Sequence, residues 1–195
     1  RGTGFQTVTF AAGSGLLTIG SYAFYSCNAL TSIIIPAPVT SMGVGAFYVC
    51  STLGSVTFAA GSVLETIGAD TFYQTGLTSI EIPASVTEIA TNAFRSCTQL
   101  ASVTFTPSTN WSSGITVSTQ AFLETTSLAT IYIANGQKIN NVPITSPGSM
   151  SNPYGHVGDV TLSTIFTDNG VTYTYTIKSG TTTDVIITGT TAGTS

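Results

Sequence analysis

Two short motifs recur along the first two thirds of the chain, always in the same order. The first has the pattern apolar-x-x-apolar-x-apolar and returns about every 23 to 25 residues, and once after about 28. Its copies begin at Phe5, Leu30, Leu53, Leu77, Leu100 and Leu128. The second motif contains a phenylalanine preceded by Ala or Thr, at Phe24, Phe47, Phe72, Phe94 and Phe122. A period of this length predicts a solenoid, in which each repeat is one layer that buries its apolar face against the next.

The first motif has the spacing of a half-buried β-strand. Because strand side chains alternate between two faces, we expect Leu77, Ile80 and Ile82 to point inward and their neighbours to face solvent. Composition agrees, since 42% of the residues are apolar and only 6% are charged. Many of the apolar residues are β-branched, which suits a pleated surface better than a helix. The sequence therefore predicts a mainly β solenoid.

Residues 77–97 closely resemble the BspA-type leucine-rich repeats, whose pattern runs Leu-x-x-Ile-x-Ile-Pro, then Ser-Val-Thr-x-Ile-Gly, then Ala-Phe-x-x-Cys. The resemblance extends over about residues 5–133. It implies a curved solenoid on a surface or secreted protein that takes part in adhesion to host proteins or to other cells. The expected fold class is mainly β, with a leucine-rich-repeat solenoid of about five to six repeats followed by a small β-hairpin and strand segment.

The pattern divides the chain into three parts. These are a solenoid at 1–134, an irregular loop or degenerate repeat at 135–159, and a hairpin and strand segment at 160–195. Asp168, Asn169 and Gly170 give a type I′ hairpin signal between two alternating runs, and residues 184–188 have the pattern of a third strand. In the resembling family such a segment often introduces further repeats. We therefore expect residues 160–195 to be a junction within a longer protein.

Three cysteines occupy one position of the second motif, three residues after its phenylalanine. Thr75 and Thr125 take the same position in other copies, so a small hydroxyl side chain also fits there. This pattern favours Cys27, Cys50 and Cys97 as small side chains stacked in the core. A Cys27–Cys50 disulfide and a metal site are the alternatives, although an odd number of cysteines disfavours a disulfide framework.

The sequence offers no recognisable catalytic or metal-binding group. His156 is the only histidine and lies in a predicted loop, so it has no partner for a zinc site or a catalytic triad. The acidic residues lack the spacing of a calcium loop. The two facing carboxylates that glycoside hydrolysis needs could come from Asp70 and Glu88 only by accident of packing. We predict no enzymatic activity, no catalytic residue, no cofactor and no bound metal.

Charge and hydropathy exclude two kinds of partner. The net charge is −4, with four basic residues in all, so the chain has no basic stripe for a phosphate backbone and nucleic acid is not expected. No apolar run approaches the roughly 20 residues that span a bilayer, so membrane insertion is not expected either.

Two rows of outward-facing side chains are the candidate binding surfaces. One lies on the exposed face of the predicted strands, at Ile34, Thr57, Glu81, Thr104 and Tyr132. The other follows the repeat phenylalanine, at Tyr25, Tyr48, Tyr73, Arg95 and Leu123. Stacked tyrosines offer a large rigid contact area at little entropic cost. The alternative is that these rings only cover the edge of the solenoid.

The longest insertion between two repeats carries two further candidates. Asn110 begins an Asn-Trp-Ser tripeptide, which matches the acceptor for N-glycosylation. Trp111 either packs over the edge of a repeat or anchors a partner.

These observations leave two functions open. The first is an extracellular or cell-surface module that binds a protein or glycan on another cell or in the matrix. The alternative is a structural unit of an extracellular filament, sheet or stalk, assembled through open solenoid ends. No capping sequence precedes the strand at residues 5–10, so we expect a preceding repeat or a second chain to cover that edge.

Overall fold

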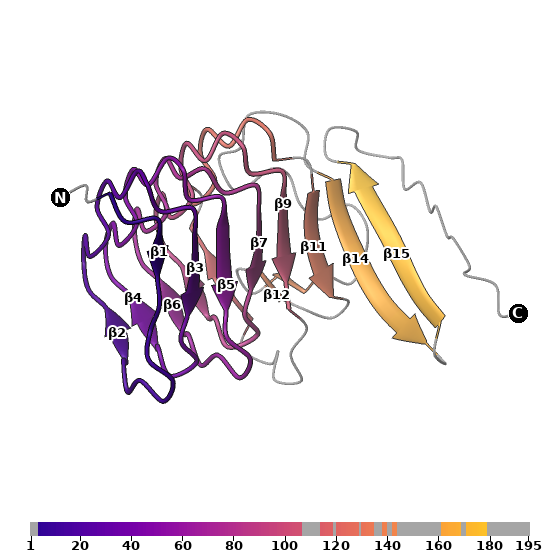
Figure 1. The fold of residues 1–195 in the computed structure, drawn as a ribbon. Coiled ribbons are helices and arrows are strands. Elements are labelled where there is room, and N and C mark those ends of the chain that lie inside the picture. The colour runs from indigo at the N-terminus through magenta and orange to yellow at the C-terminus, as the bar shows by residue number, and fades with distance from the viewer. Residues whose placement is uncertain are drawn as a thin grey trace, which may run out of the picture.

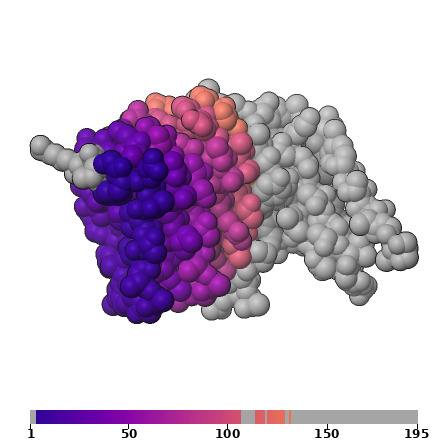
Figure 2. All heavy atoms as spheres, viewed as in Figure 1, coloured from indigo at the N-terminus to yellow at the C-terminus, as the bar shows by residue number. Residues whose placement is uncertain are grey.

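A computed structural model describes residues 4–106, 114–118, 120–128, 130–134, 138–139, 142–143, 161–168 and 171–178. These residues form strands and turns without any helix, and the strands wind into a solenoid whose repeats follow one another along its axis (Figure 1). Figure 2 shows the first repeats as consecutive layers, beginning with the indigo N-terminal layer. The predicted mainly β solenoid is confirmed.

The first motif forms a row of parallel strands, here called the front strands. They are β1 (Thr7–Val8), β3 (Ser32–Ile35), β5 (Ser55–Phe58), β7 (Ser79–Ile82), β9 (Ser102–Phe105) and β11 (Thr130–Ala134). Strands β1, β3 and β5 pair in one sheet, and β7, β9 and β11 pair in another. At the boundary the N–H of Thr78 donates to the carbonyl of Gly54 over 3.4 Å, so the layers continue across it.

The second motif begins with shorter strands, which form the opposite wall. They are β2 (Thr18–Ile19), β4 (Ser41–Met42), β6 (Thr66–Ile67), β8 (Glu88–Ile89) and β10 (Thr116–Val117). All five pair in parallel in chain order. The second residue of each strand is buried, so every repeat contributes one apolar side chain to the core from this wall.

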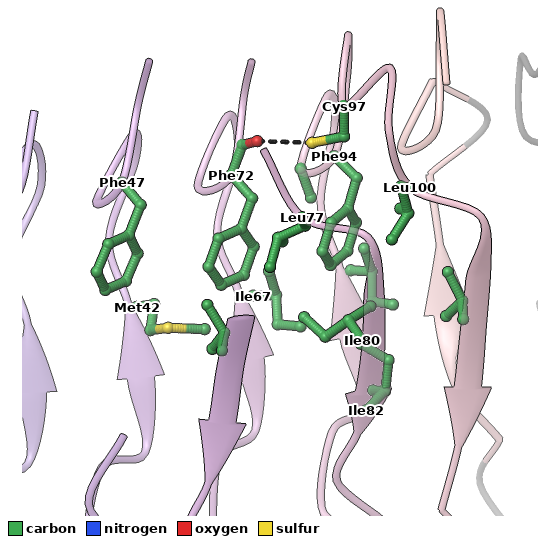
Figure 3. Packing of buried hydrophobic residues seen from close by; sticks show 14 of the residues in the cluster. Met42, Phe47, Ile67, Phe72, Leu77, Ile80, Ile82, Phe94, Cys97 and Leu100 are labelled. Atoms are coloured by element: carbon green, nitrogen blue, oxygen red, sulfur yellow. Dashed lines mark hydrogen bonds between the residues drawn. The ribbon is translucent and has the colours of Figure 1, made fainter. Parts of the chain in front are cut away.

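The core lies between the two walls (Figure 3). Leu77, Ile80 and Ile82 are buried and Glu81 is exposed, as the alternation of strand side chains predicted. In β3 the middle residue Ile34 is 61% exposed, between two buried isoleucines. Each fully buried side chain of this size contributes about 1.5–3 kcal/mol before conformational entropy opposes it, so the layers stabilise one another.

The repeat phenylalanines form one continuous stack through the solenoid. Consecutive ring centroids from Phe24 to Phe122 lie 4.9, 5.4, 5.3 and 5.1 Å apart, and the planes of neighbouring rings differ by at most 17°. Figure 3 shows Phe47, Phe72 and Phe94 in this arrangement. Phe24, in the first layer, is only half-buried, whereas the other four rings are buried.

Tight turns hold these phenylalanines in place. The residues two before and two after Phe72 are Asp70 and Gln74, and both have left-handed backbone conformations, with φ of 54° and 53°. The N–H groups of Asp70, Phe72 and Gln74 donate to carbonyls of the next turn over 2.8–3.1 Å, while the N–H groups between them bond within their own turn. Neighbouring repeats show the same arrangement. The turns are therefore hydrogen-bonded from layer to layer, as strands are.

The three cysteines are buried with free thiols, which is the core position that the sequence favoured. The thiol of Cys50 donates to the carbonyl of Phe24 over 2.8 Å, and that of Cys97 donates to the carbonyl of Phe72 over 2.9 Å. Thr75 takes the same position of the motif, and its hydroxyl donates to the carbonyl of Phe72 in its own turn over 3.0 Å, whereas the two thiols donate to the preceding repeat. A small donor is thus the common requirement of this position. Free thiols leave the Cys27–Cys50 disulfide without support.

The front row continues beyond the repeats. Strand β14 (Thr161–Asp168) pairs in parallel with β11 and antiparallel with β15 (Val171–Lys178), and β12 (Lys138–Ile139) pairs with β13 (Val142–Pro143). The pairing of Asp168 with Val171 is that of the predicted hairpin. The strand expected at 184–188 lies outside the described residues. The division of the chain at 134 and 159 stays a prediction.

Candidate binding surfaces

In the described part of the outward row of the front strands, Ile34, Thr57, Glu81 and Thr104 lie on one face of the solenoid. Ile34 is in register with Thr57, and Glu81 is in register with Thr104. The backbone of Tyr132 pairs with Thr104 in the next layer. Glu81 is the only charged side chain in the described part of this row, and it accepts a hydrogen bond from the hydroxyl of Thr106 over 3.0 Å. The row is a mostly neutral, hydroxyl-bearing surface.

The tyrosine row is a second stack, on the outside of the turns. Tyr25 and Tyr48 are stacked at 5.7 Å between centroids, and Tyr48 and Tyr73 at 4.5 Å. The guanidinium of Arg95 lies 5.9 Å from the centroid of Tyr73, in a cation–π arrangement. Partial burial, together with Tyr73 and Asp70, raises the pKa of the Tyr48 hydroxyl. Because neighbours occupy both ring faces of Tyr48 and Tyr73, these two residues present ring edges and hydroxyl groups to a partner.

An ion pair closes the row at its C-terminal end. Arg95 contacts the carboxylate of Glu124 at 3.2 Å, and the hydroxyl of Ser96 donates to the same carboxylate over 2.6 Å. Hydrogen bonds from Ser96 and Arg95 lower the pKa of Glu124. The sequence analysis named Leu123, which follows Phe122 as Arg95 follows Phe94. It missed Glu124, the next residue, because the contacts of Glu124 are with side chains of another repeat.

Tyr22 is a further aromatic that sequence reasoning missed. Its ring is 51% exposed and meets Tyr25 and Tyr48 edge-on, at 6.1 and 6.2 Å between centroids. It also lies over Gly45, where a Cβ atom would collide with the ring. The sequence does carry a signal for this contact: a tyrosine in one repeat and a glycine in the next occupy the same position of the motif, two residues before the phenylalanine.

Loops after the front strands alternate in length and leave two grooves of about 380 Å³ each. Longer loops carrying Ala-Ala-Gly-Ser follow β1 and β5, at residues 11–14 and 59–62. The chain after β3 and β7 turns at once, at Pro36 and Pro83.

The β3 groove is lined by Thr9, Phe10, Ala12, Ile34 and Pro36, among others. The β7 groove is lined by Thr57, Phe58, Ala60, Glu81 and Pro83, among others. Sequence reasoning missed both, although the alternation in loop length was visible.

Three singled-out residues lie outside the described part of the chain. These are Asn110, Trp111 and His156. The glycosylation site at Asn110 and the two interpretations of Trp111 stay predictions.

Within the described residues, no group of three or more His, Cys, Asp or Glu side chains could hold a metal ion. No helix in that part of the chain is long and apolar enough to cross a bilayer.

Comparison with known proteins places the chain among repeat proteins. A model of the BspA-type leucine-rich repeat region matches residues 17–143 in six copies. No curated protein matches the chain. A leucine-rich cell surface protein from Faecalibacterium prausnitzii is 30% identical, with a TM-score of 0.54 over 67% of this chain and 32% of that one.

The pneumococcal vaccine antigen PcpA has a similar fold. It is 22% identical, with a TM-score of 0.53 over 74% of this chain and 34% of that one. The chain thus spans about a third of the length of both solved structures.

Proposed function

Because the chain belongs to the BspA-type leucine-rich repeat family, we propose that it is a binding module of an extracellular or cell-surface protein. Its partner is a protein or a glycan on another cell or in the matrix. A related structure is described as a leucine-rich cell surface protein, which supports this location.

The observation that carries the proposal is the set of side chains that the core does not use. Tyr25, Tyr48 and Tyr73 are held in a fixed stack outside the buried phenylalanines. Ile34 is exposed on a strand whose inward positions are already filled. Rigid aromatic and apolar groups of this kind lose little entropy when a partner binds.

We infer that the module has no catalytic activity. Burial raises the pKa of the Cys50 thiol to about 12 and that of Cys97 to about 11, so both stay protonated near neutral pH and are poor nucleophiles. The exposed carboxylate of Glu124 is neutralised by Arg95. The match to a repeat family and the relative described as a leucine-rich cell surface protein support this inference.

A binding assay tests the proposal. Beads coated with the purified chain are added to cultured cells, to immobilised matrix proteins and to a glycan array, with heat-unfolded chain as the control. We expect saturable binding to at least one of these surfaces by the folded chain alone. Binding that does not saturate, or that the unfolded chain reproduces, would sink the proposal.

A structural role is the second candidate, and the exposed apolar groups of the first layer favour it. Leu17 is 60% exposed and Phe5 is 39% exposed, and the ring of Phe24, which stacks on Phe47, is only half-buried. Chains that stacked end to end would bury these groups. Sedimentation and electron microscopy over a range of concentrations separate the two functions: rods that lengthen with concentration indicate a filament, and particles of constant mass indicate a binding module.

A further inference from the structure

The two grooves are copies of one site, displaced by two repeats. Phe10 of the β3 groove corresponds to Phe58 of the β7 groove, and Pro36 corresponds to Pro83. The β3 groove lies over a short loop, between the longer loops that follow β1 and β5, and the β7 groove lies over the next short loop, beside the same loop after β5. Ala59 lines both grooves, so they share a wall and are immediate neighbours.

The spacing of the grooves restricts what can occupy both. Strands β3 and β7 are separated by β5, and adjacent strands lie about 4.8 Å apart, so equivalent points of the two grooves are about 10 Å apart. An extended β-strand repeats a side-chain direction at about 7 and about 13 Å, which does not match. A polyproline II helix has three residues per turn and rises about 3.1 Å per residue, so residues i and i+3 point the same way about 9 Å apart.

The lining of the grooves fits the same class of ligand. Each groove presents one half-buried phenylalanine, small alanine side chains and proline, which is Pro36 and Pro38 in the β3 groove and Pro83 in the β7 groove. Polyproline II segments dock on aromatic-lined grooves of this kind. The grooves differ in charge at the middle of the strand, where the outward residue is Ile34 in the β3 groove and Glu81 in the β7 groove. Among the described residues, the carboxylate of Glu81 has a hydrogen bond from the hydroxyl of Thr106 and no ion pair with a basic side chain. A basic ligand residue beside the β7 groove would therefore be favoured.

We propose that the paired grooves bind a basic, proline-containing peptide segment in the polyproline II conformation. The segment runs along the solenoid axis and places residues i and i+3 in the two grooves, with a lysine or arginine against Glu81. This inference rests on the proposed binding function and specifies the ligand for one part of the surface.

Fluorescence anisotropy with two labelled synthetic peptides tests the spacing. Both peptides contain the same residues, including one arginine, but the prolines stand at i and i+3 in one and at i and i+4 in the other. We expect the first to bind roughly tenfold more tightly, because only its prolines can enter both grooves together. Equal affinity for the two peptides, or no binding of either, overturns the proposal.

Variants that fill one groove at a time test the location. Ala12→Trp and Ala60→Trp change exposed residues of the two grooves, and Thr98→Trp adds the same side chain at an exposed position outside them. We expect each groove variant to weaken binding of the first peptide roughly tenfold, and the control to leave it unchanged. Circular dichroism melts show whether the variants stay folded. Unchanged affinity in both groove variants contradicts the proposal.

A charge variant tests the basic residue. Glu81→Gln keeps an acceptor for Thr106 but removes the charge, whereas Glu88→Gln removes an exposed carboxylate from the opposite wall. We expect only Glu81→Gln to weaken binding, by about two- to fivefold in low salt. Equal effects of the two variants contradict the assigned charge pair.

Two further outcomes separate this inference from the proposed function. If an oligosaccharide of β-1,4-linked glucose binds instead, and loses affinity in both groove variants, the grooves are glycan sites and the peptide inference is wrong. If chain-coated beads bind cells or matrix but the i, i+3 peptide does not bind, the inference fails while the binding function stands.

Discussion

At the scale of single residues, the stacked phenylalanines and the cysteine position decide how the layers join. Local alternation was enough to predict that Ile80 and Ile82 are buried and Glu81 is exposed, because it depends only on strand geometry. The positions of Tyr22 and Glu124 could not be predicted in this way. Each is fixed by a contact with another repeat, so its place depends on the register of the layers.

Phe72→Ala should be strongly destabilising. The ring is fully buried between Phe47 and Phe94, so its removal leaves a cavity in the stack and is expected to cost about 3–5 kcal/mol. Urea denaturation measures this loss. Tyr73→Ala, at the neighbouring surface position, is the matched control and should cost clearly less. Equal losses would show that the buried stack is not what joins the layers.

Stability should fall in alkali because the thiols are buried. Burial raises the pKa of Cys97 from 9.0 to about 11 in the folded chain, so the unfolded chain loses its proton first. The stability that the buried, protonated thiol adds to the folded chain is fully present below about pH 9 and is lost as the pH rises toward about 11. Urea midpoints of the parent chain and of Cys97→Thr, measured across this window, check the prediction. The parent should lose more stability than the variant; parallel curves would contradict the raised pKa.

At the scale of elements, the strands were predictable and the turns and grooves were not. Strand patterns are local, and the hairpin at Asp168 follows from a two-residue turn signal. The left-handed residues of the turns, such as Asp70 and Gln74, are held by hydrogen bonds to the next layer. The grooves arise only when loops of different length are stacked. Features that need two repeats to exist leave little signal in one.

Gly68→Ala and Gly20→Ala should differ although both occupy the same position of the motif. A Cβ atom at Gly68 would collide with the carbonyl oxygen of Met42 in the preceding layer, whereas nothing lies within 4 Å of one at Gly20. We expect the first change to cost about 1–3 kcal/mol and the second to be close to neutral. Thermal denaturation of the two variants and of the parent chain measures both stability losses. A neutral Gly68→Ala would contradict the tight stacking of the layers at the wall opposite the front strands.

At the scale of the whole molecule, the first layer is the exposed end of the stack. Among the described strands, β1 pairs with β3 alone, and Leu17 and Tyr22 are more than half exposed. We propose that a preceding repeat of the same polypeptide, or a second chain, covers this edge in the natural protein. Hydrogen exchange at Thr7 to Phe10 should then be slow in the natural assembly and fast in the separated chain. Fast exchange in both would show that the edge is bare.

The central claim is that the solenoid binds a partner through side chains that its core does not use. The most direct test measures affinity and melting temperature together, for the partner found in the bead assay. The variants are Tyr48→Ala with Tyr73→Ala, and Ala12→Trp with Ala60→Trp, which change the turn surface and the grooves separately. We predict that at least one pair lowers the affinity about tenfold or more while the melting temperature stays within a few degrees of the parent. Unchanged affinity in both pairs, or losses seen only together with unfolding, would contradict the claim.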